Sequence, residues 1–350
     1  MVTIGSDPHK SSHTFVAVDG NGRKLAEKTV KAVSEGHLEA LRWASQWPER
    51  VWALENSRHL VRRLERELLV AGEAAVRVPS RLMAESRKKG RQRGKSDPID
   101  ALAVARAALR EPGLPVAQLE GVSREIRLLV DHREDLVGDR SQMQNRLRWH
   151  LHELEPGYRV PAGALSRVAA LKRLEVLLAG HSGTVAELAR ELLGRIRELT
   201  LRIDQLEGQL GQLVAPLASS LLALQGCGVL TAAKIIGEVG NISRFRSKAA
   251  FARYNGSAPI PVWSGNDDHH RLNPGGNRQL NAALHRIAIT QARSGGLGRA
   301  YLDHRLQERD TKKEAMRALK RRLSDEVYSR LLADERTRMS DKETPNAQAA

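Results

Sequence analysis

The stretch that decides the fold reads Gly94-Lys95-Ser96-Asp97-Pro98-Ile99-Asp100, and it runs directly into Ala-Leu-Ala-Val-Ala-Arg at residues 101–106. Proline is tolerated in the first turn of a helix, and serine or aspartate before it is a good N-cap, so a helix is predicted to begin here. Residues three apart share a helix face, so Asp97 and Asp100 point the same way. Two adjacent carboxylates repel each other unless a cation such as Mg²⁺ binds between them. The pair therefore predicts a metal site, or else an N-cap and a first-turn acid favoured by the helix dipole.

The residues before this stretch predict a mixed sheet with flanking helices. Apolar and alternating runs predict strands, and two helical patterns lie between them. The expected strands are 2–5, 13–18, 23–30, 51–54 and 74–78, and the expected helices are 34–45 and 59–70. Three strands in series followed by alternating strands and helices give the element order of ribonuclease-H-like folds.

Two more acids stand at the ends of predicted strands. Asp7 follows the first strand and Glu55 follows the fourth. Open α/β sheets bind their ligands at such strand ends, and the helix that carries Asp97 and Asp100 is expected to lie across them. Taken singly, Asp7 is also compatible with a loop cap and Glu55 with a solvated residue after a buried strand. Together, the four acids predict one metal centre.

The composition points to a polyanionic partner. The chain has 350 residues with 57 Lys and Arg against 41 Asp and Glu, a formal net charge of +16. Nucleic acid is the first candidate for such a partner, although a non-catalytic architectural protein would carry the same charge. A single cysteine, Cys227, excludes an internal disulfide framework and a cysteine-based zinc site. With no signal peptide or apolar run of membrane-spanning length, a cytoplasmic protein is expected.

A basic run precedes the Asp97–Asp100 pair and contains no acid. It is either a solvated loop or a clamp for phosphates, and the two interpretations are compatible if the loop becomes ordered on nucleic acid. The expected nucleic-acid contacts in it are Arg87, Lys88, Lys89, Arg91, Arg93 and Lys95.

The middle of the chain predicts two long helices. An apolar stripe from Ile126 to Leu154 indicates the first, whose arginines include Arg146 and Arg148 as expected nucleic-acid contacts. Apolar residues from Val185 to Leu213 recur at spacings of three and four, which is the pattern of a coiled-coil seam. The seam is explained equally by a helical hairpin within one chain and by dimerisation.

The third region combines a glycine turn with an isolated serine. The turn at Gly226 leads into a helix ending at Gly240, which suits a helix-hairpin-helix motif that holds a phosphate, or else a tight packing turn. Ser264 follows Pro259 and Pro261, so it is expected in a loop, either exposing its hydroxyl for attack or capping a turn. Asn277 and Arg278, where the next helix begins, are further expected nucleic-acid contacts.

Together these features predict a chain of four parts. They are an α/β catalytic domain at 1–112, a basic helix and coiled-coil region at 113–216, a small helical domain carrying the serine at 217–335, and a disordered tail at 336–350.

Two motif sets resemble a known family over roughly residues 1 to 335. Asp7, Ala53-Leu54-Glu55 and Lys95-Ser96-Asp97-Pro98-Ile99-Asp100-Ala101 resemble the four-acid signature of the DEDD transposases of insertion sequences, which are related to the Piv-type DNA invertases. The second set is similar to their C-terminal domain. It comprises 226–240, Tyr254-Asn255-Gly256-Ser257-Ala258-Pro259, Ser264-Gly265 and Gly276-Asn277-Arg278-Gln279-Leu280.

The resemblance implies a RuvC-like N-terminal domain, a coiled coil and a helical transposase domain. It implies that Asp7, Glu55, Asp97 and Asp100 bind Mg²⁺ and that Ser264 attacks the DNA phosphate to form a covalent phosphoserine. It further implies donor and target DNA, a structured guide RNA encoded by the element, and a homo-oligomer, either a dimer or a tetramer, joined by the coiled coil. The run Asn-Asp-Asp-His-His at 266–270, directly after Ser264-Gly265, departs from the family pattern.

Two other functions compete with this interpretation. A RuvC-like Holliday-junction nuclease would use the four acids to activate water and would need no serine. A non-catalytic nucleic-acid-binding protein would need only the basic helices and the glycine turn.

Overall fold

The computed structural model describes residues 1–55, 60–79, 82–83, 96–111, 113–119, 121–264, 267–271, 273 and 275–343, with the side chains of 262–271 and 341–343 left out. The six basic residues expected to contact nucleic acid between Arg87 and Lys95 lie outside this range. The chain divides into two compact units, Met1–Glu120 and Gly121–Ala350. Within the described residues, no helix has the length and apolar character needed to span a membrane.

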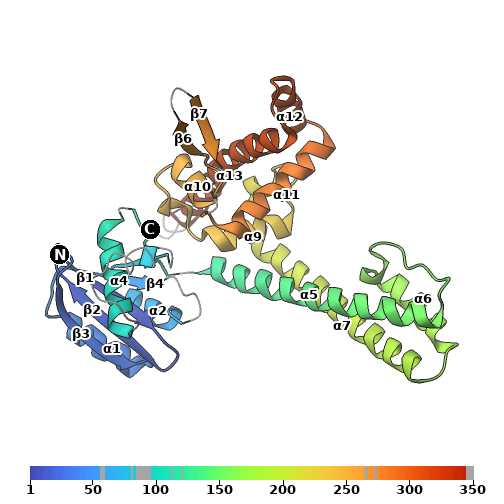
Figure 1. The fold of residues 1–350 in the computed structure, drawn as a ribbon, viewed down its shortest axis with the longest axis horizontal. Coiled ribbons are helices and arrows are strands. Elements are labelled where there is room, and N and C mark those ends of the chain that lie inside the picture. The colour runs from blue at the N-terminus through green and yellow to red at the C-terminus, as the bar shows by residue number, and fades with distance from the viewer. Residues whose placement is uncertain are drawn as a thin grey trace, which may run out of the picture. The chain divides into compact units, whose positions relative to one another are not determined.

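The first unit is built on a five-stranded sheet with the order β3-β2-β1-β4-β5 (Figure 1). The first three strands along the chain pair antiparallel, whereas β4 pairs parallel with β1, and β5 pairs parallel with β4. The strands are β1 (Val2–Pro8), β2 (Ser12–Val18), β3 (Lys24–Lys31), β4 (Arg50–Glu55) and β5 (Ala75–Val78). The mixed sheet predicted from the sequence is therefore confirmed, with its strands in the predicted order.

One face of the sheet carries the larger core. Helices α1 (Ser34–Ala44) and α2 (Arg62–Val70) pack on it. The rings of Phe15 and Trp52 meet edge to face, 5.2 Å apart, and neither side chain is exposed. Burying aromatic side chains of this size contributes much of the stability of a small α/β unit.

Helix α4 (Asp97–Arg110) covers the other face. It begins where the sequence predicted, with Ser96 at the N-cap position and a proline in the first turn. The Ser96 side chain makes no capping hydrogen bond, so the proline and the acids of the first turn are the local features that favour this start. Ala101 and Ala105 of α4 pack on Val16 and Val18 of β2.

Gly5 of β1 lets α4 lie directly on the sheet. A Cβ atom built on Gly5 would overlap the carbonyl oxygen of Ala101 and lie 2.5 Å from the amide nitrogen of Ala105. No side chain fits in that space. The short spacing brings the first turn of α4 close to the end of β1, where Asp7 lies two residues after Gly5 on the same face.

In its described residues, the second unit is helical except for one two-stranded ribbon. Its helices are α5 (Val122–Leu154), α6 (Val168–Ala179), α7 (Thr184–Val214), α8 (Ser219–Leu222), α9 (Val229–Val239), α10 (Lys248–Tyr254), α11 (Arg278–Ser294), α12 (Leu297–Gln307) and α13 (Lys312–Glu343), with 3₁₀ turns at Ala164–Ser166 and Ile242–Arg244. The ribbon pairs β6 (Ile260–Ser264) antiparallel with β7 (Asp267–Arg271).

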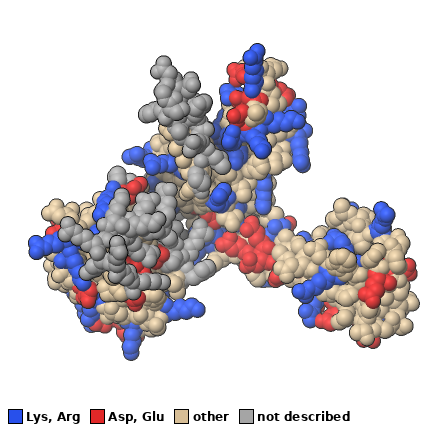
Figure 2. Space-filling view, in the orientation of Figure 1, with Lys and Arg blue, Asp and Glu red and all other residues tan. Residues whose placement is uncertain are grey.

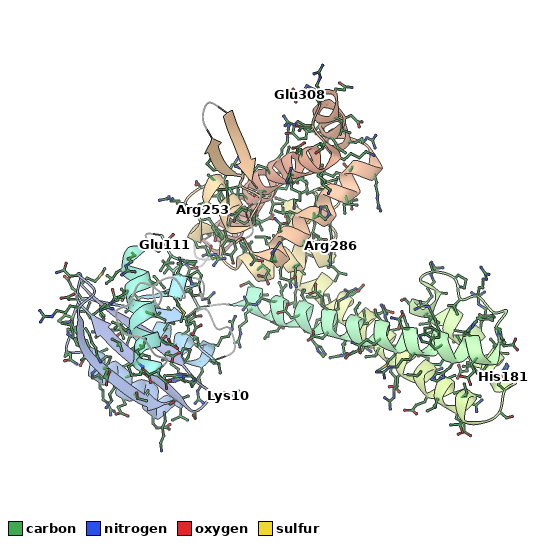
Figure 3. All side chains as sticks on the ribbon, in the orientation of Figure 1. Lys10, Glu111, His181, Arg253, Arg286 and Glu308 are labelled. Carbon is green, nitrogen blue, oxygen red and sulfur yellow. The ribbon has the colours of Figure 1, made fainter. Side chains whose placement is uncertain are left out.

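Helices α5 and α7 form an antiparallel hairpin within the chain (Figure 1). Arg133 donates two hydrogen bonds to Glu207, and Arg140 donates one to Thr200, so later residues of α5 meet earlier residues of α7. His181 lies at the far end of this hairpin (Figure 3), where its backbone carbonyl accepts a hydrogen bond from Arg190. The apolar seam of α7 is thus used inside one chain, as the hairpin alternative expected.

The contact face of α7 is rotated from the predicted seam in its first half. Ala186, Ala189 and Leu193 are buried there, whereas Leu188 is 44% exposed. Alanines allow α7 to approach its neighbours closely, which leaves the larger leucine outside the contact. Further along, Ile196, Ile203, Leu206 and Leu210 are buried as predicted.

The base of the hairpin and the C-terminal helices share one hydrophobic core. Ile126 of α5 and Val214 of α7 belong to the same buried cluster as Ile235 of α9 and Leu284 of α11. This explains why the structure does not separate the chain at residue 216, the predicted border between middle and C-terminal domains. Helix α13 also continues through residues 336–343, the first part of the expected disordered tail, and residues 344–350 lie outside the described range.

Candidate active site

Two of the predicted acids lie side by side at the carboxyl edge of the sheet. In the parallel pairing of β1 with β4, Ser6 is opposite Leu54. The next residues along the two strands are Asp7 and Glu55, which therefore lie on the same face. It is the face that α4 covers, because Gly5 and Ala53, two residues earlier in each strand, both face that helix.

The first turn of α4 supplies the other two acids. Asp97 is half-exposed, whereas Asp100 is buried. The backbone amide of Asp100 donates to the carbonyl oxygen of Ser96 at 3.0 Å, which is the first helical hydrogen bond after the cap. The helix start thus fixes the spacing of the acid pair, as the sequence predicted.

The pKa of Asp7 reflects its burial and the charges of the other three acids. Burial raises the pKa of the Asp7 carboxyl from 3.8 to about 6, against an opposing effect of His9. The charges of Asp100, Asp97 and Glu55 raise the same pKa further. Carboxylates crowded in this way are stabilised by a bound cation, which removes their mutual repulsion. The charges of Glu55, Asp97 and Asp100 thus act on Asp7, and among the four acids it is the ligand atoms of Asp7 and Asp97 that lie within 4.8 Å of each other in the described residues.

One residue of this cluster was missed by the sequence analysis. The Nε2 atom of His9 lies 3.2 Å from Oδ2 of Asp7 and 3.3 Å from Oδ1 of Asp97. In the described part of the chain, Asp7, His9 and Asp97 are the one group of at least three His, Cys, Asp or Glu whose ligand atoms all lie within 4.8 Å of one another. The available signal was the spacing, because His9 follows Asp7 by the two residues that keep side chains on one face of a strand.

The donor set fits a divalent cation. Carboxylate oxygens are the preferred ligands of Mg²⁺, Mn²⁺ and Ca²⁺. Asp7 and Asp97 come from different elements, and both are held in place, by the sheet and by the start of α4. Such a fixed, partly buried pair binds a cation without reorganising the backbone.

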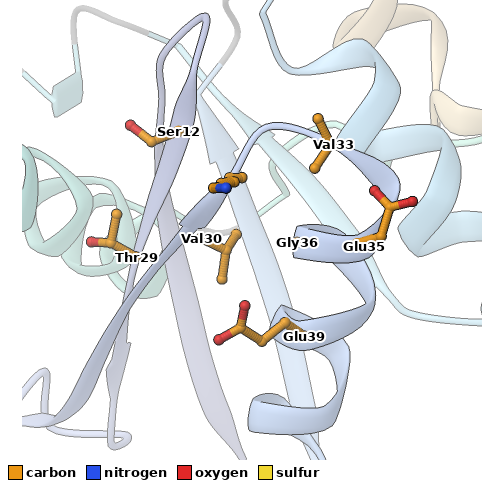
Figure 4. Close-up of a pocket in the computed structure, with 8 residues that line it drawn as sticks. Ser12, Thr29, Val30, Val33, Glu35, Gly36 and Glu39 are labelled. Carbon is orange, nitrogen blue, oxygen red and sulfur yellow. The ribbon is translucent and has the colours of Figure 1, made fainter.

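A shallow hollow of about 460 Å³ lies elsewhere, at the edge between β3 and α1 (Figure 4). It is lined by Thr29, Lys31, Gly36 and Glu39 among others and includes none of the four acids.

The sequence placed Ser264 in a loop, but its backbone is the last residue of β6, opposite Asp267 of β7. Pro261 is compatible with this strand because both strands of a two-stranded ribbon are edges, where a missing N–H is tolerated. The Ser264 side chain is outside the described residues, and the serine belongs to the second unit whereas the acids belong to the first.

The base of this ribbon is held by close backbone packing. A Cβ atom built on Gly276 would overlap Gly256 and lie 2.8 Å from the carbonyl carbon of Asn255. The segment that leads into β6 and the segment that follows β7 are therefore in contact at Gly256 and Gly276. Asn255 is fully buried, and its side chain donates to Oγ of Ser324 in α13 at 2.7 Å.

The predicted nucleic-acid contacts of the second unit divide into two kinds. Arg146, Arg148 and Arg278 are exposed. Asn277 instead has its side chain engaged within the protein: its Oδ1 accepts from the amide of Leu280 at the start of α11, and its Nδ2 donates to Glu238 at 2.6 Å. Asn277 therefore fixes the start of α11.

The glycine turn before α9 has the local form expected of it. Gly226 adopts a positive φ of 86°, and α9 begins directly after Gly228. The preceding helix α8 has four residues. These features fit a helix-hairpin-helix and a packing turn equally, since Gly226 also lies against α11, with the Thr290 Cβ 3.0 Å from its built Cβ.

Basic side chains gather on the outer face of α11, α12 and α13 (Figure 2). Exposed basic residues of these helices and of the connection between α12 and α13 include Arg286, Arg293, Arg299, Arg309, Lys313 and Arg317. Arg286 projects from α11, and Arg253 lies near the base of the ribbon (Figure 3). Such a surface attracts polyanions through counterion release.

Comparison with known proteins identifies the family. A sequence-family model of DEDD transposases of the IS110 type matches residues 4–156. A second family model, described as "Transposase IS116/IS110/IS902 family", matches residues 218–303. The two matches together cover more than half of the chain. The chain belongs to the IS110/IS116 family of DEDD transposases. As a member of this transposase family it is an enzyme of phosphoryl transfer on DNA.

Relatives of this IS110/IS116 chain extend over nearly its full length. The insertion element IS116 44.8 kDa protein of Streptomyces clavuligerus is 27% identical over 96% of this chain and 95% of its own length. The IS900 42 kDa protein of Mycobacterium paratuberculosis is 24% identical over 94% and 95%. A probable family 20 transposase of Pseudomonas aeruginosa is 29% identical over 47% and 49%. A solved structure of Thermus thermophilus RuvC with a Holliday junction substrate aligns with 31% of this chain and 93% of its own, at 17% identity and a TM-score of 0.25.

Proposed function

We propose that this transposase cuts and joins the DNA of an insertion sequence through a covalent phosphoserine at Ser264, with Mg²⁺ held by Asp7, Glu55, Asp97 and Asp100. The observation that carries the proposal is the crowding of the four acids around Asp7, whose pKa is raised by burial and by the charges of the other three. The family resemblance of the Ser264-Gly265 motif supports the serine.

The roles of the residues follow from their positions. Asp7 and Asp97 present carboxylate oxygens from two rigid elements, and Glu55 and Asp100 add negative charge beside them. A divalent cation bound there neutralises charge on the scissile phosphate. The Ser264 hydroxyl would attack the phosphorus to form a serine–phosphate ester, breaking the P–O bond to one DNA strand end, which leaves as a hydroxyl and takes up the proton that the serine loses. Because the phosphodiester energy is kept in the serine–DNA bond, a second strand end can displace the serine without ATP.

The partners are donor DNA, target DNA and a structured guide RNA. The net charge of +16 and the basic surface on α11–α13 support polyanionic partners, and the RNA rests on the family resemblance. We also propose a homo-oligomer formed along the α5–α7 hairpin. Large apolar side chains exposed on the outside of the hairpin support this oligomer. Leu128 is 54% exposed, Trp149 is 74% exposed and Leu201 is 48% exposed.

The test is to trap the protein on a DNA substrate carrying the element ends and to map any covalent adduct by mass spectrometry. We expect a phosphodiester to Ser264, lost in Ser264→Ala and kept in the control Ser141→Ala, a serine on the exposed side of α5. An adduct to tyrosine, or recombination by Ser264→Ala, would overturn the serine assignment.

A second candidate is a Holliday-junction nuclease that activates water. It is favoured by one observation: all four acids belong to the first unit, which does not contain Ser264. Junction cleavage by Ser264→Ala, with loss of cleavage in the Asp97→Asn, Asp100→Asn double variant, would support it. Full recombination by that double variant would instead support a non-catalytic binding protein.

A further inference from the structure

His9 has an unusual position between two of the four acids. Its Nε2 atom is nearly equidistant from a carboxylate oxygen of Asp7, at 3.2 Å, and one of Asp97, at 3.3 Å. The two carboxylates come from different elements, the end of β1 and the first turn of α4. The three ligand atoms therefore surround one shared point.

The position of His9 is fixed by its backbone. Its amide donates to the carbonyl oxygen of Ser12 at 2.8 Å, closing the turn between β1 and β2. Its neighbour Pro8 is paired with His13 of β2. The imidazole itself is 49% exposed, so a cation from solvent can reach it.

A hydrogen-bonded pair explains this geometry poorly. One N–H directs its hydrogen along a single line and bonds best to one acceptor. Here Nε2 favours neither oxygen. The spacing is instead close to that of neighbouring ligands around an octahedral ion, which is about 3.0 Å when the metal–ligand distance is about 2.1 Å.

We propose that Nε2 of His9 is a ligand of the cation bound by Asp7 and Asp97, so that the centre has a mixed nitrogen and oxygen donor set. This inference rests on the proposed function, because it concerns the same metal centre. Divalent first-row transition ions, Mn²⁺ included, accept an imidazole nitrogen beside carboxylate oxygens, whereas Mg²⁺ selects oxygen. The centre is therefore expected to bind Mn²⁺ more tightly than four carboxylates alone would bind it.

The test uses the full-length protein with Mn²⁺ alone. Electron spin echo spectroscopy of bound Mn²⁺ detects a coordinated imidazole nitrogen directly, and calorimetry gives the affinities for Mn²⁺ and Mg²⁺. We expect nitrogen coupling in the unaltered protein and none in His9→Ala. We also expect His9→Ala to weaken Mn²⁺ binding about 10- to 100-fold and Mg²⁺ binding by much less.

The matched control is His304→Ala. His304 is an exposed histidine whose Nδ1 lies 3.6 Å from Glu308, and its removal should leave the nitrogen coupling unchanged. Absence of nitrogen coupling in the unaltered protein, or equal losses of Mn²⁺ and Mg²⁺ affinity in His9→Ala, would overturn the assignment. Nitrogen coupling in a protein that forms no phosphoserine adduct would support His9 as a metal ligand and would contradict the proposed reaction at Ser264.

Discussion

Gly5 of β1 lies so close to Ala105 of α4 that a built Cβ would be 2.8 Å from the Ala105 Cβ atom and 2.5 Å from its amide nitrogen. This contact sets the height of α4 above the sheet. Since Asp97 and Asp100 lie in the first turn of α4 and Asp7 lies near the end of β1, the same contact sets the separation of the acids.

The substitution Gly5→Ala should therefore damage both stability and catalysis. Overpacking of a rigid core costs about 1–3 kcal/mol, and we expect a loss of that order in the free energy of unfolding, measured by urea denaturation. Adduct formation should fall further than stability, because α4 must move away from Asp7. Gly20→Ala is the control, since nothing lies within 4 Å of a Cβ built there. Wild-type metal affinity in Gly5→Ala would contradict the role given to this contact.

Gly276→Ala should disturb the ribbon that carries Ser264. The added methyl group would overlap Gly256, so the backbone segments before β6 and after β7 would have to separate. We expect the yield of covalent adduct to drop at least tenfold, while Mn²⁺ binding at the acids stays unchanged because they belong to the other unit. Gly211→Ala in α7, which has open space around it, should keep full adduct yield. An unchanged yield in Gly276→Ala would show that the ribbon does not need this close contact.

The metal-free protein should lose stability as the pH rises through about 6. The folded state raises the pKa of Asp7 from 3.8 to about 6, chiefly by burial. Between these values the folded state binds more protons than the unfolded state, so the free energy of unfolding falls with rising pH. Asp7→Asn should therefore raise the melting temperature at pH 8 and raise it less at pH 4.5, where only the first part of this loss has occurred. A divalent cation should stabilise the unaltered protein at pH 8 and have a much smaller effect on the variant.

The control for this pH dependence is Asp139→Asn, an exposed acid on α5. It should give the same melting temperature as the unaltered protein at both pH values. A destabilised Asp7→Asn protein at pH 8 would contradict the expected repulsion among the acids.

Much of the first unit was predictable because its signals are local. Strand-length apolar runs, the turn between β2 and β3 and the proline at the start of α4 each act within a few residues. That Asp7 and Glu55 lie side by side was predictable because parallel strands end at the same edge of a sheet. Gly5 was not recognised, since its importance depends on a helix that begins some ninety residues later.

The second unit shows where such reasoning fails. Leu188 matched the apolar spacing, but the structure buries Ala186 and Ala189 instead, because close helix packing selects small side chains that a hydrophobicity pattern undervalues. Pro261 suggested a loop, yet it lies in a strand, since an isolated ribbon has edges on both sides. His9 was overlooked because its two-residue spacing from Asp7 is common, and its closeness to Asp97 depends on where α4 lies.

The length of α5 has a mechanical consequence. Its 33 residues extend about 50 Å at 1.5 Å per residue, and only its first turns join the core around α9. A tilt of about 5° at that end moves the opposite end by about 4 Å, on this length. A small rearrangement around α9 would therefore be accompanied by a much larger displacement at the end of the hairpin near His181.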